Sequence, residues 1–340
     1  MNTTPEQRLD KMWARGRELL GTRYAILGGA MSWISESNLV SAISNAGGFG
    51  VIAGGSMMPE QLAEVIIATQ KKTDKPFGVN LITMHPELDA LIDKCLELNV
   101  SHIVLAGGLP SGASIKRVKD GGAKVICFAP ALALAKRLVR SGADGLVIEG
   151  NEAGGHIGPV ATSVLAQEIL PVITEVPVFV AGGIGRGEAI VSYLEMGAAG
   201  VQIGTRLVCA TECIAHENFK KAFIRAQARD AVSTAQLDPR FPVIPVRALA
   251  NDGTRHFMEK QKEVVDRFND GQVTLAEGQL EIEHFWVGAL KRAVIDGDVE
   301  NGSMMAGQSV GMVKEEQSTE EILDELVNQA KTAIESKNTA

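Results

Sequence analysis

Short apolar segments recur along the first two thirds of the chain, and each is followed by glycine and then by a segment with helical periodicity. Eight of them have the length and composition of buried strands. They are residues 24–27, 50–53, 77–81, 102–106, 124–128, 145–148, 178–181 and 200–203. Because continuous apolar strands that alternate with helices favour a parallel sheet, the pattern predicts an α/β protein.

The segments between these strands carry apolar residues at the three- and four-residue spacing of amphipathic helices. The clearest are residues 60–71, 87–98, 132–141 and 187–196. Eight strand–helix units in about 200 residues predict a (β/α)8 TIM barrel. A doubly wound open sheet is the alternative, although it usually has fewer strands and one dominant glycine loop.

The regular alternation stops after Ile214. Helices are predicted at residues 215–230, 256–273 and 282–298, and prolines interrupt the segment between the first two. We therefore expect a smaller, mainly helical C-terminal subdomain at residues 232–299, which covers the mouth of the barrel.

The last part of the chain is expected to return to the barrel. Residues 300–313 are rich in glycine and other small residues. A closing helix is predicted after Ser318, where Glu321 completes a capping box three residues later. The barrel unit is thus expected to comprise residues 1–231 and 300–340.

Composition narrows the classes of function. The chain has 340 residues, of which 45% are hydrophobic, enough for one large domain or for a large and a small one. The formal charge is −8 and no basic cluster is present, so nucleic acid is not an expected partner. No segment is apolar and long enough to cross a membrane, and the N-terminus does not resemble a secretory signal, so we expect a cytoplasmic protein.

The sequence gives no indication of a metal centre. Cys209 and Cys213 are four residues apart, but no second pair stands at the spacing of a zinc site, and all four cysteines are expected to be reduced. No G-x-S-x-G or H-E-x-x-H motif and no clustered pair of carboxylates is present. Hydrolase and metalloenzyme chemistry is therefore not expected, and no metal ligand is predicted.

Two glycine loops late in the barrel are candidate phosphate sites. One contains Gly182 and Gly183, and the other contains Gly204 and Thr205. Backbone N–H groups in such loops bind anions, and the last two loops of a barrel are the usual phosphate site. Ordinary tight turns, which also favour glycine, are the alternative. A dinucleotide-binding loop is rejected because the segment comes too late in the chain to be a first Rossmann turn.

One histidine is the best candidate for acid–base chemistry. His156 lies among four glycines between Gly150 and Gly158, in the loop that follows the predicted strand at 145–148. An imidazole has a pKa suited to proton transfer near neutral pH. A structural loop histidine is the alternative. His85 is a second candidate, but Pro86 after it favours a role in a turn.

Two amide side chains interrupt apolar strands. Asn80 is expected at the end of its strand, and Gln202 lies within the last one. A buried amide needs a hydrogen-bond partner, so both are expected to face a ligand at the barrel mouth. For Asn80, a turn-forming role is the alternative.

Several motifs, taken in order, resemble one group of flavoproteins. They are GGAMSWIS, NAGGFGVIAGG, KPFGVNL, EGNEAGGHIG, VAGGIGRGEA and GVQIGTR. The group is the FMN-dependent family of nitronate monooxygenases (2-nitropropane dioxygenases) and FabK-like type II enoyl-acyl-carrier-protein reductases. The resemblance spans nearly the whole chain, and the tail DGDVENGSMMAGQSVGMVKEE is closer to the enoyl reductase branch. Gly28 and Ala30 stand where related proteins often carry Gln or Pro.

The resemblance implies a barrel with FMN at its mouth and identifies His156 with the catalytic histidine of the family. The glycines around His156 would let this loop approach the flat flavin ring. The expected cofactor-binding residues are Gly29, Ala30, Met31, Asn80, Glu149, Gly154, Gly155, Gly158, Gly182, Gly183, Gln202, Ile203, Gly204, Thr205, Met305 and Gln308. The tail residues Ser303, Ala306 and Gly307 are also expected to approach the cofactor.

Three reactions follow as hypotheses. The first is reduction of an enoyl thioester in fatty acid biosynthesis, with NAD(P)H as co-substrate. The second is oxidation of alkyl nitronates with O2, and the third is NAD(P)H-dependent reduction of quinones or free flavin. A barrel that only stores flavin would leave His156 without a role. The expected partner is a small molecule or an acyl thioester, while an acyl carrier protein and a homodimer remain open.

Overall fold

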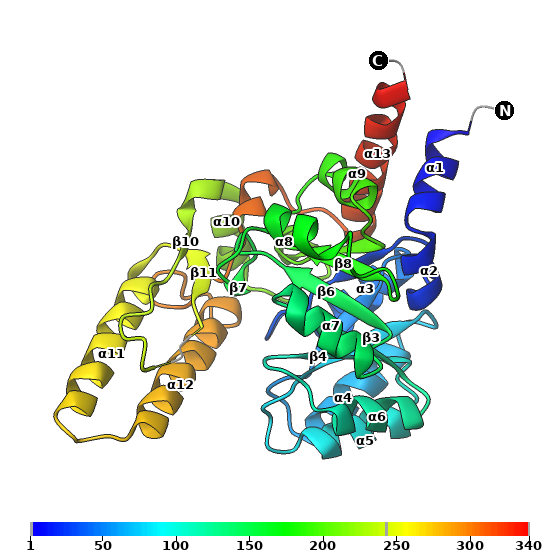
Figure 1. Cartoon of the computed structure of the whole chain (residues 1–340). Helices are drawn as coiled ribbons and strands as arrows, with labels where there is room; N and C mark the ends of the chain where they lie inside the picture. The colour runs from blue at the N-terminus through cyan, green and yellow to red at the C-terminus, as the bar shows by residue number, and fades with distance from the viewer. Residues whose placement is uncertain (1–2, 242–243, 339–340) are drawn as a thin grey trace.

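Eight parallel strands form the nearly closed barrel shown in Figure 1, a computed structural model that describes residues 3–241 and 244–338. The strands are β1 (Ile26–Gly28), β2 (Gly50–Ala53), β3 (Phe77–Ile82), β4 (His102–Ala106), β5 (Lys124–Phe128), β6 (Gly145–Glu149), β8 (Val178–Ala181) and β9 (Gly200–Ile203). Their order is β1-β9-β8-β6-β5-β4-β3-β2, and a parallel bridge between Leu27 and Phe49 joins the two end strands. The prediction of a (β/α)8 TIM barrel is therefore confirmed.

Helices connect the strands and cover the outside of the barrel. They are α3 (Ser37–Asn45), α4 (Pro59–Gln70), α5 (Leu88–Glu97), α6 (Gly112–Asp120), α7 (Leu132–Arg140), α8 (Thr162–Ile169) and α9 (Gly187–Glu195). Local sequence fixes where several of them begin. Ser111, for example, accepts a hydrogen bond from the Ser114 N–H at 3.0 Å and caps α6.

The two ends of the chain lie side by side on the barrel (Figure 1). The N-terminal helices α1 (Pro5–Met12) and α2 (Ala14–Leu20) precede β1, and α13 (Thr319–Asn338) packs against α1 and α9. The capping box predicted for the last helix is present, since the Glu321 carboxylate accepts hydrogen bonds from the N–H and the hydroxyl of Ser318 at 2.7 and 2.8 Å.

A small antiparallel sheet was not predicted. Its strands are β7 (Gly155–His156), β10 (Ala231–Ser233) and β11 (Val246–Leu249), in the order β10-β11-β7. These strands are too short to show a period of two residues, and β11 follows a proline-interrupted segment. The predicted helix at 215–230 is also divided, into α10 (Glu217–Arg225) and a 3-10 turn.

Two further helices, α11 (Asp252–Asn269) and α12 (Leu275–Val294), form a pair that extends away from the barrel in Figure 1. They enclose a hydrophobic cluster of their own, separate from the barrel core. Its members are Phe241, Val246, Phe257, Val264, Ile282 and Trp286. The division into 1–231 with 300–340 and 232–299 stays a proposal; residues 1–2, 242–243 and 339–340 of these units lie outside the described residues.

The cysteines are free and lie in the protein interior. Burial raises the pKa values of the Cys95, Cys127 and Cys209 thiols to about 12. Among the described residues, no three His, Cys, Asp or Glu side chains are grouped so that they could hold a metal ion. None of the helices in this part of the chain combines the length and the apolar character needed to span a bilayer.

Candidate functional site at the barrel mouth

The loops after β1 and β9 meet at the carboxyl ends of the strands. The Gly29 N–H donates to the Ile203 carbonyl at 2.8 Å, and a Cβ at Gly29 would lie 3.4 Å from Nε2 of Gln202. The Met31 side chain also approaches the loop after β9, because a Cβ added at Gly204 would lie 3.4 Å from the Sδ atom of Met31. Ala30 and Met31 are half-buried. The parallel register thus gathers these predicted residues at one end of the barrel.

The two amides have different surroundings. Gln202 is 9% exposed, and its side chain forms no hydrogen bond with any residue that the structure describes. Asn80 is half-buried, and its Nδ2 donates to the Val104 carbonyl at 3.3 Å. The prediction that Asn80 ends its strand is wrong, because the ladder with β4 continues to Ile82. The Gln202 amide, which has no protein partner among the described residues, is thus available to a ligand at the mouth.

The loop after β6 presents His156 on a short strand. Gly155 has a positive φ of 80°, and the two residues of β7 pair with Arg247 and Val246 of β11. The Ile157 N–H continues this connection by donating to the Pro245 carbonyl at 2.9 Å. His156 is exposed, and at Gly158 a Cβ would have no heavy atom within 4 Å. The histidine is therefore held by its backbone beside open space.

The tail reaches the same loop. A Cβ at Gly154 would lie 2.6 Å from the Gly307 nitrogen, so only glycine allows the two backbones to approach so closely. The Gly307 N–H donates to Oγ1 of Thr205 at 3.0 Å, and the Gln308 N–H donates to the Glu152 carbonyl at 2.9 Å. Residues 307 and 308 therefore join the loops that follow β6 and β9.

Met305 completes this arrangement. It is half-buried and forms an antiparallel bridge with Ala248. A Cβ added at Gly155 would lie 3.6 Å from the Sδ atom of Met305. Ser303 and Ala306 are buried. Of the predicted tail residues, Met305 and Gln308 keep partly accessible side chains beside the loop that carries His156.

The two candidate phosphate loops expose backbone donors. Gly182 and Gly183 have φ values of 97° and 73°. Within residues 3–241 and 244–338, the N–H groups of Gly183 and Gly204 donate to no protein acceptor. Unpaired donors in two neighbouring glycine loops are the arrangement that binds an anion.

Glu149 is a carboxyl group at the mouth with a shifted pKa. It is the last residue of β6, and burial raises the pKa of its carboxyl to about 8 from an ordinary value near 4.5. Glu149 therefore carries its proton at neutral pH and can donate a hydrogen bond. Its position was predictable from the sequence, but its protonation state was not, because that state depends on the closed barrel around it.

The other candidate histidine has a local role. His85 accepts a hydrogen bond on Nδ1 from the Glu87 N–H at 3.1 Å, and its carbonyl accepts from the Leu88 N–H at 3.1 Å. The turn expected from Pro86 is confirmed. His85 is thus engaged in the backbone geometry that leads into α5.

Three charged residues near the site were missed by sequence reasoning. Glu152 accepts hydrogen bonds from the N–H and hydroxyl of Thr162 at 2.8 and 2.7 Å and fixes the loop on α8. Arg247, 9% exposed, donates through Nε to the Asn151 carbonyl at 2.7 Å. Arg206 is buried next to Thr205. The sequence could have pointed to these three residues, because each is a charged residue directly beside a glycine loop or an apolar run.

These features fit the expected FMN. The unpaired N–H groups of Gly183 and Gly204 suit a terminal phosphate, and the unpartnered Gln202 amide suits the polar edge of a flavin ring. Gly154 and Gly155 face the tail, whereas Gly158 in the same loop has no heavy atom within 4 Å of an added Cβ and leaves room for a flat group. No Rossmann fingerprint is present for an adenosine half, so FMN fits this site better than FAD.

Comparison with known proteins extends over nearly the whole chain. The family model described as nitronate monooxygenase matches residues 15–94 and 88–329. A Mycobacterium tuberculosis protein named (3aS,4S,5R,7aS)-5-hydroxy-7a-methyl-1-oxo-octahydro-1H-indene-4-carboxyl-CoA dehydrogenase is 30% identical over 345 residues, covering 94% of this chain and 96% of that protein. A probable nitronate monooxygenase of Staphylococcus saprophyticus is 27% identical, over 84% of this chain and 94% of its own length.

Solved structures give a similar result. The structure of FabK from Thermotoga maritima superposes with a TM-score of 0.85 and 35% sequence identity. The match covers 96% of this chain and 98% of that protein, so it includes the tail as well as the barrel.

Proposed function

Since the chain belongs to the nitronate monooxygenase family of FMN-dependent oxidoreductases, we propose that it reduces enoyl thioesters with NAD(P)H as co-substrate. The observation that carries this proposal is the tail. Its sequence resembles the enoyl reductase branch, and Gly307 lies directly against Gly154 in the loop of His156. The 35% identity with FabK and the CoA thioester in the name of the mycobacterial relative support the same substrate class.

Bound FMN would supply the hydride chemistry, and the chain would position it. The N–H groups of Gly183 and Gly204 would bind the phosphate, and Gln202 would pair with the polar edge of the ring. Glu149, protonated near pH 7, would donate a hydrogen bond to an acceptor at the mouth. Met305 would close one side of the site.

His156 would carry the proton transfer. Reduction of an enoyl thioester adds a hydride to the β-carbon and a proton to the α-carbon. The imidazole of His156 would give its proton to the α-carbon and regain one from solvent, to which it is exposed. The pairing of β7 with β11 would hold the ring in place for this step.

Oxidation of nitronates is the second candidate, supported by the description of the family model and by the staphylococcal relative. In that reaction His156 would remove a proton from the carbon of a neutral nitroalkane. A preformed nitronate has already lost this proton and would not need the histidine.

The deciding experiment measures the two half-reactions of wild type and His156→Ala. The purified protein should be yellow and should release FMN. Under anaerobic conditions it is reduced with NADH or NADPH, and then reoxidised with crotonyl thioester, a quinone or O2. We expect rapid reduction by one nicotinamide and fastest reoxidation by the thioester. Slow reduction by both nicotinamides, with turnover of nitronates in air, would favour the second candidate, and quinone as the best acceptor would favour the third hypothesis.

In His156→Ala, bound FMN and its reduction by NAD(P)H should be retained, because neither requires a protein acid at the substrate carbon. Reoxidation by the thioester should slow by about 10²–10⁴-fold, the usual contribution of a positioned acid. His85→Ala is the matched control and should leave both half-reactions unchanged. Wild-type rates for both half-reactions in His156→Ala would contradict its role as the proton donor.

A further inference from the structure

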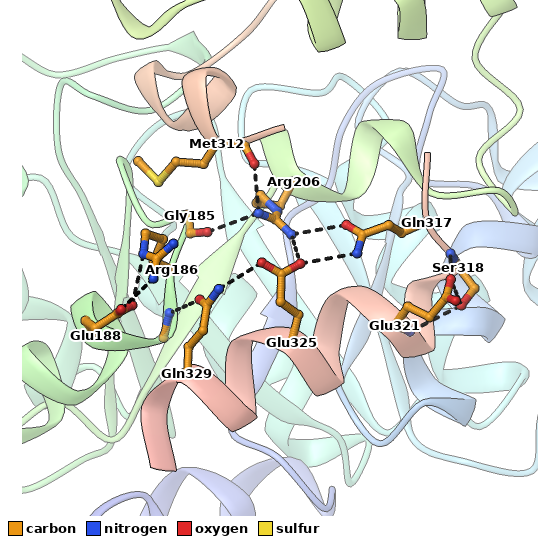
Figure 2. Close-up of polar contacts among 11 residues, drawn as sticks. Gly185, Arg186, Glu188, Arg206, Met312, Gln317, Ser318, Glu321, Glu325 and Gln329 are labelled. Carbon is orange, nitrogen blue, oxygen red and sulfur yellow. Dashed lines mark hydrogen bonds and ion pairs between the residues drawn. The ribbon is translucent and has the colours of Figure 1, made fainter. Parts of the chain in front are cut away.

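One buried arginine connects the two loops assigned to the phosphate. Arg206 directly follows Thr205, and its side chain is 4% exposed. Its guanidinium donates to the carbonyl of Gly185, in the loop after β8, at 3.4 Å, and to the carbonyl of Met312 at 2.9 Å. Figure 2 shows both carbonyls in contact with the arginine. The loops after β8 and β9 therefore share one cation.

The counter-ion comes from the last helix. The Glu325 carboxylate, on α13, accepts from Arg206 at 2.8 Å and from Nε2 of Gln317 at 3.2 Å. Its other oxygen accepts from Nε2 of Gln329 at 2.8 Å, and Oε1 of Gln329 accepts the Gly187 N–H at 2.9 Å. This chain of contacts returns to the loop after β8 (Figure 2).

The same loop is pressed directly against the helix. A Cβ at Gly187 would lie 2.1 Å from the Leu326 carbonyl oxygen, and a Cβ at Gly185 would lie 2.5 Å from Sδ of Met312. Glycine at position 187 is thus required for backbone contact with α13, while Gly185 packs against the Met312 side chain of the tail. The polar network and the close packing hold residues 185–187 at the same place.

The electrostatics favour a permanently charged pair. Burial alone would raise the pKa of Glu325, but the hydrogen bonds and the charge of Arg206 outweigh it, and the pKa lies below its usual range. A buried guanidinium that loses its partner is strongly destabilised, so the two side chains require one another. The pair is therefore a fixed element of the protein at neutral pH.

We propose that Arg206 and Glu325 are positioning residues that set the two glycine loops at the separation required by the FMN phosphate. The inference rests on the proposed function only in placing the phosphate at Gly183 and Gly204. Arg206 is adjacent in sequence to the second loop and bonded to the first, so a change in its position moves one set of N–H donors relative to the other. Through Glu325, α13 becomes part of the phosphate site without touching the ligand.

Comparison of FMN with riboflavin tests this role, because riboflavin has the same ring and no phosphate. Apoprotein is titrated with each flavin, and binding is followed by quenching of flavin fluorescence. In Arg206→Met the dissociation constant for FMN should rise about tenfold or more, the effect of losing roughly one charge-assisted hydrogen bond. The constant for riboflavin should change little. The ratio of the FMN constant to the riboflavin constant should therefore rise. Glu325→Gln should raise this ratio as well, and Arg206→Lys should raise it less than Arg206→Met does.

Two controls separate positioning from general stability. Lys119 pairs with Asp144 at 2.7 Å directly before β6, at the amino ends of the strands, so Lys119→Met should reduce stability without changing the ratio of the two constants. Arg186→Met removes an exposed pair with Glu188 in the same loop and should leave the ratio unchanged.

An unchanged ratio in Arg206→Met, and in Glu325→Gln if the first variant does not fold, would overturn the proposal. Wild-type protein that binds riboflavin as tightly as FMN would instead overturn the phosphate site itself. Because neither measurement uses a substrate, both outcomes are distinct from failure of the proposed reaction.

Discussion

Single side chains at the two ends of the barrel show how burial sets protonation. His102, near the amino end of β4, is buried with its Nε2 2.8 Å from the Leu19 carbonyl, and burial lowers its pKa. It is therefore a neutral structural histidine. Glu149 experiences burial at the opposite end and keeps its proton. His156, in contrast to these two side chains, is exposed, so solvent can reprotonate it directly.

The pKa of Glu149 predicts how the stability of the apoprotein depends on pH. The folded protein keeps the Glu149 proton up to about pH 8, whereas the unfolded chain loses it near pH 4.5. Between these values the unfolded state binds fewer protons, so the free energy of unfolding decreases as the pH rises, by about 1.4 kcal/mol per pH unit from this group.

Glu149→Gln should remove this contribution. Urea denaturation of the variant and of wild type should give similar stabilities near pH 4.5 and an increasing advantage of the variant up to about pH 8, with no further change above it. Glu64→Gln, at an exposed position on α4, would serve as a carboxylate control on the outside of the barrel. A constant difference across the pH range would show that Glu149 is ionised in the folded protein.

At the scale of elements, the glycine loops can be tested by comparing two positive-φ positions. Gly183→Val places a side chain where a Cβ would lie 3.1 Å from Cβ of Glu152, and it obstructs the exposed N–H donors. We expect the dissociation constant for FMN to rise about tenfold or more. The control is Gly122→Val, because Gly122 has a φ of 86° and no heavy atom within 4 Å of an added Cβ.

Both substitutions should cost about 1–2 kcal/mol from backbone strain, measured by denaturation. Only Gly183→Val should weaken FMN, measured by fluorescence titration. Equal FMN affinity in the two variants would place the phosphate elsewhere.

The elements differ in how far the sequence could predict them. The barrel strands were found because each is a buried apolar run with glycine after it, and α13 was found from its capping box at Ser318 and Glu321. Strands β7 and β11 were not predicted, because their pairing joins His156 to Val246, ninety positions later in the chain. The Arg206–Glu325 contact escaped for the same reason, since no local pattern reports a partner on the other side of a fold.

At the scale of the whole molecule, two hydrophobic cores meet at the tail. Met305 packs against both the barrel core and the cluster formed by α11 and α12. Lys291 of α12 lies 5.4 Å from the ring of Trp33, in the loop after β1. Contacts of this kind place the end of α12 beside the barrel mouth, while the far ends of α11 and α12 extend away from it in Figure 1.

The proposed division at residues 232–299 predicts that the two cores can be destabilised separately. Phe257 is fully buried, with its ring 4.0 Å from that of Trp286, so Phe257→Ala should cost the second core about 3–5 kcal/mol. Two proteins in which either Trp286 or Trp13 is the sole tryptophan, with phenylalanine at the other positions, report the two cores by fluorescence in urea.

Phe257→Ala should lower the urea midpoint reported by Trp286 and leave that of Trp13 nearly unchanged, because Trp13 lies in the barrel core. The reciprocal control is Phe219→Ala, because Phe219 is a buried ring of the barrel core stacked 4.9 Å from Phe223. It should lower the urea midpoint reported by Trp13 more than the midpoint reported by Trp286. If the two reporters shift together in both variants, the chain unfolds as one cooperative unit and the division is wrong. Separate midpoints would mean that the β11 strand supporting His156 belongs to a unit that can open while the barrel stays folded.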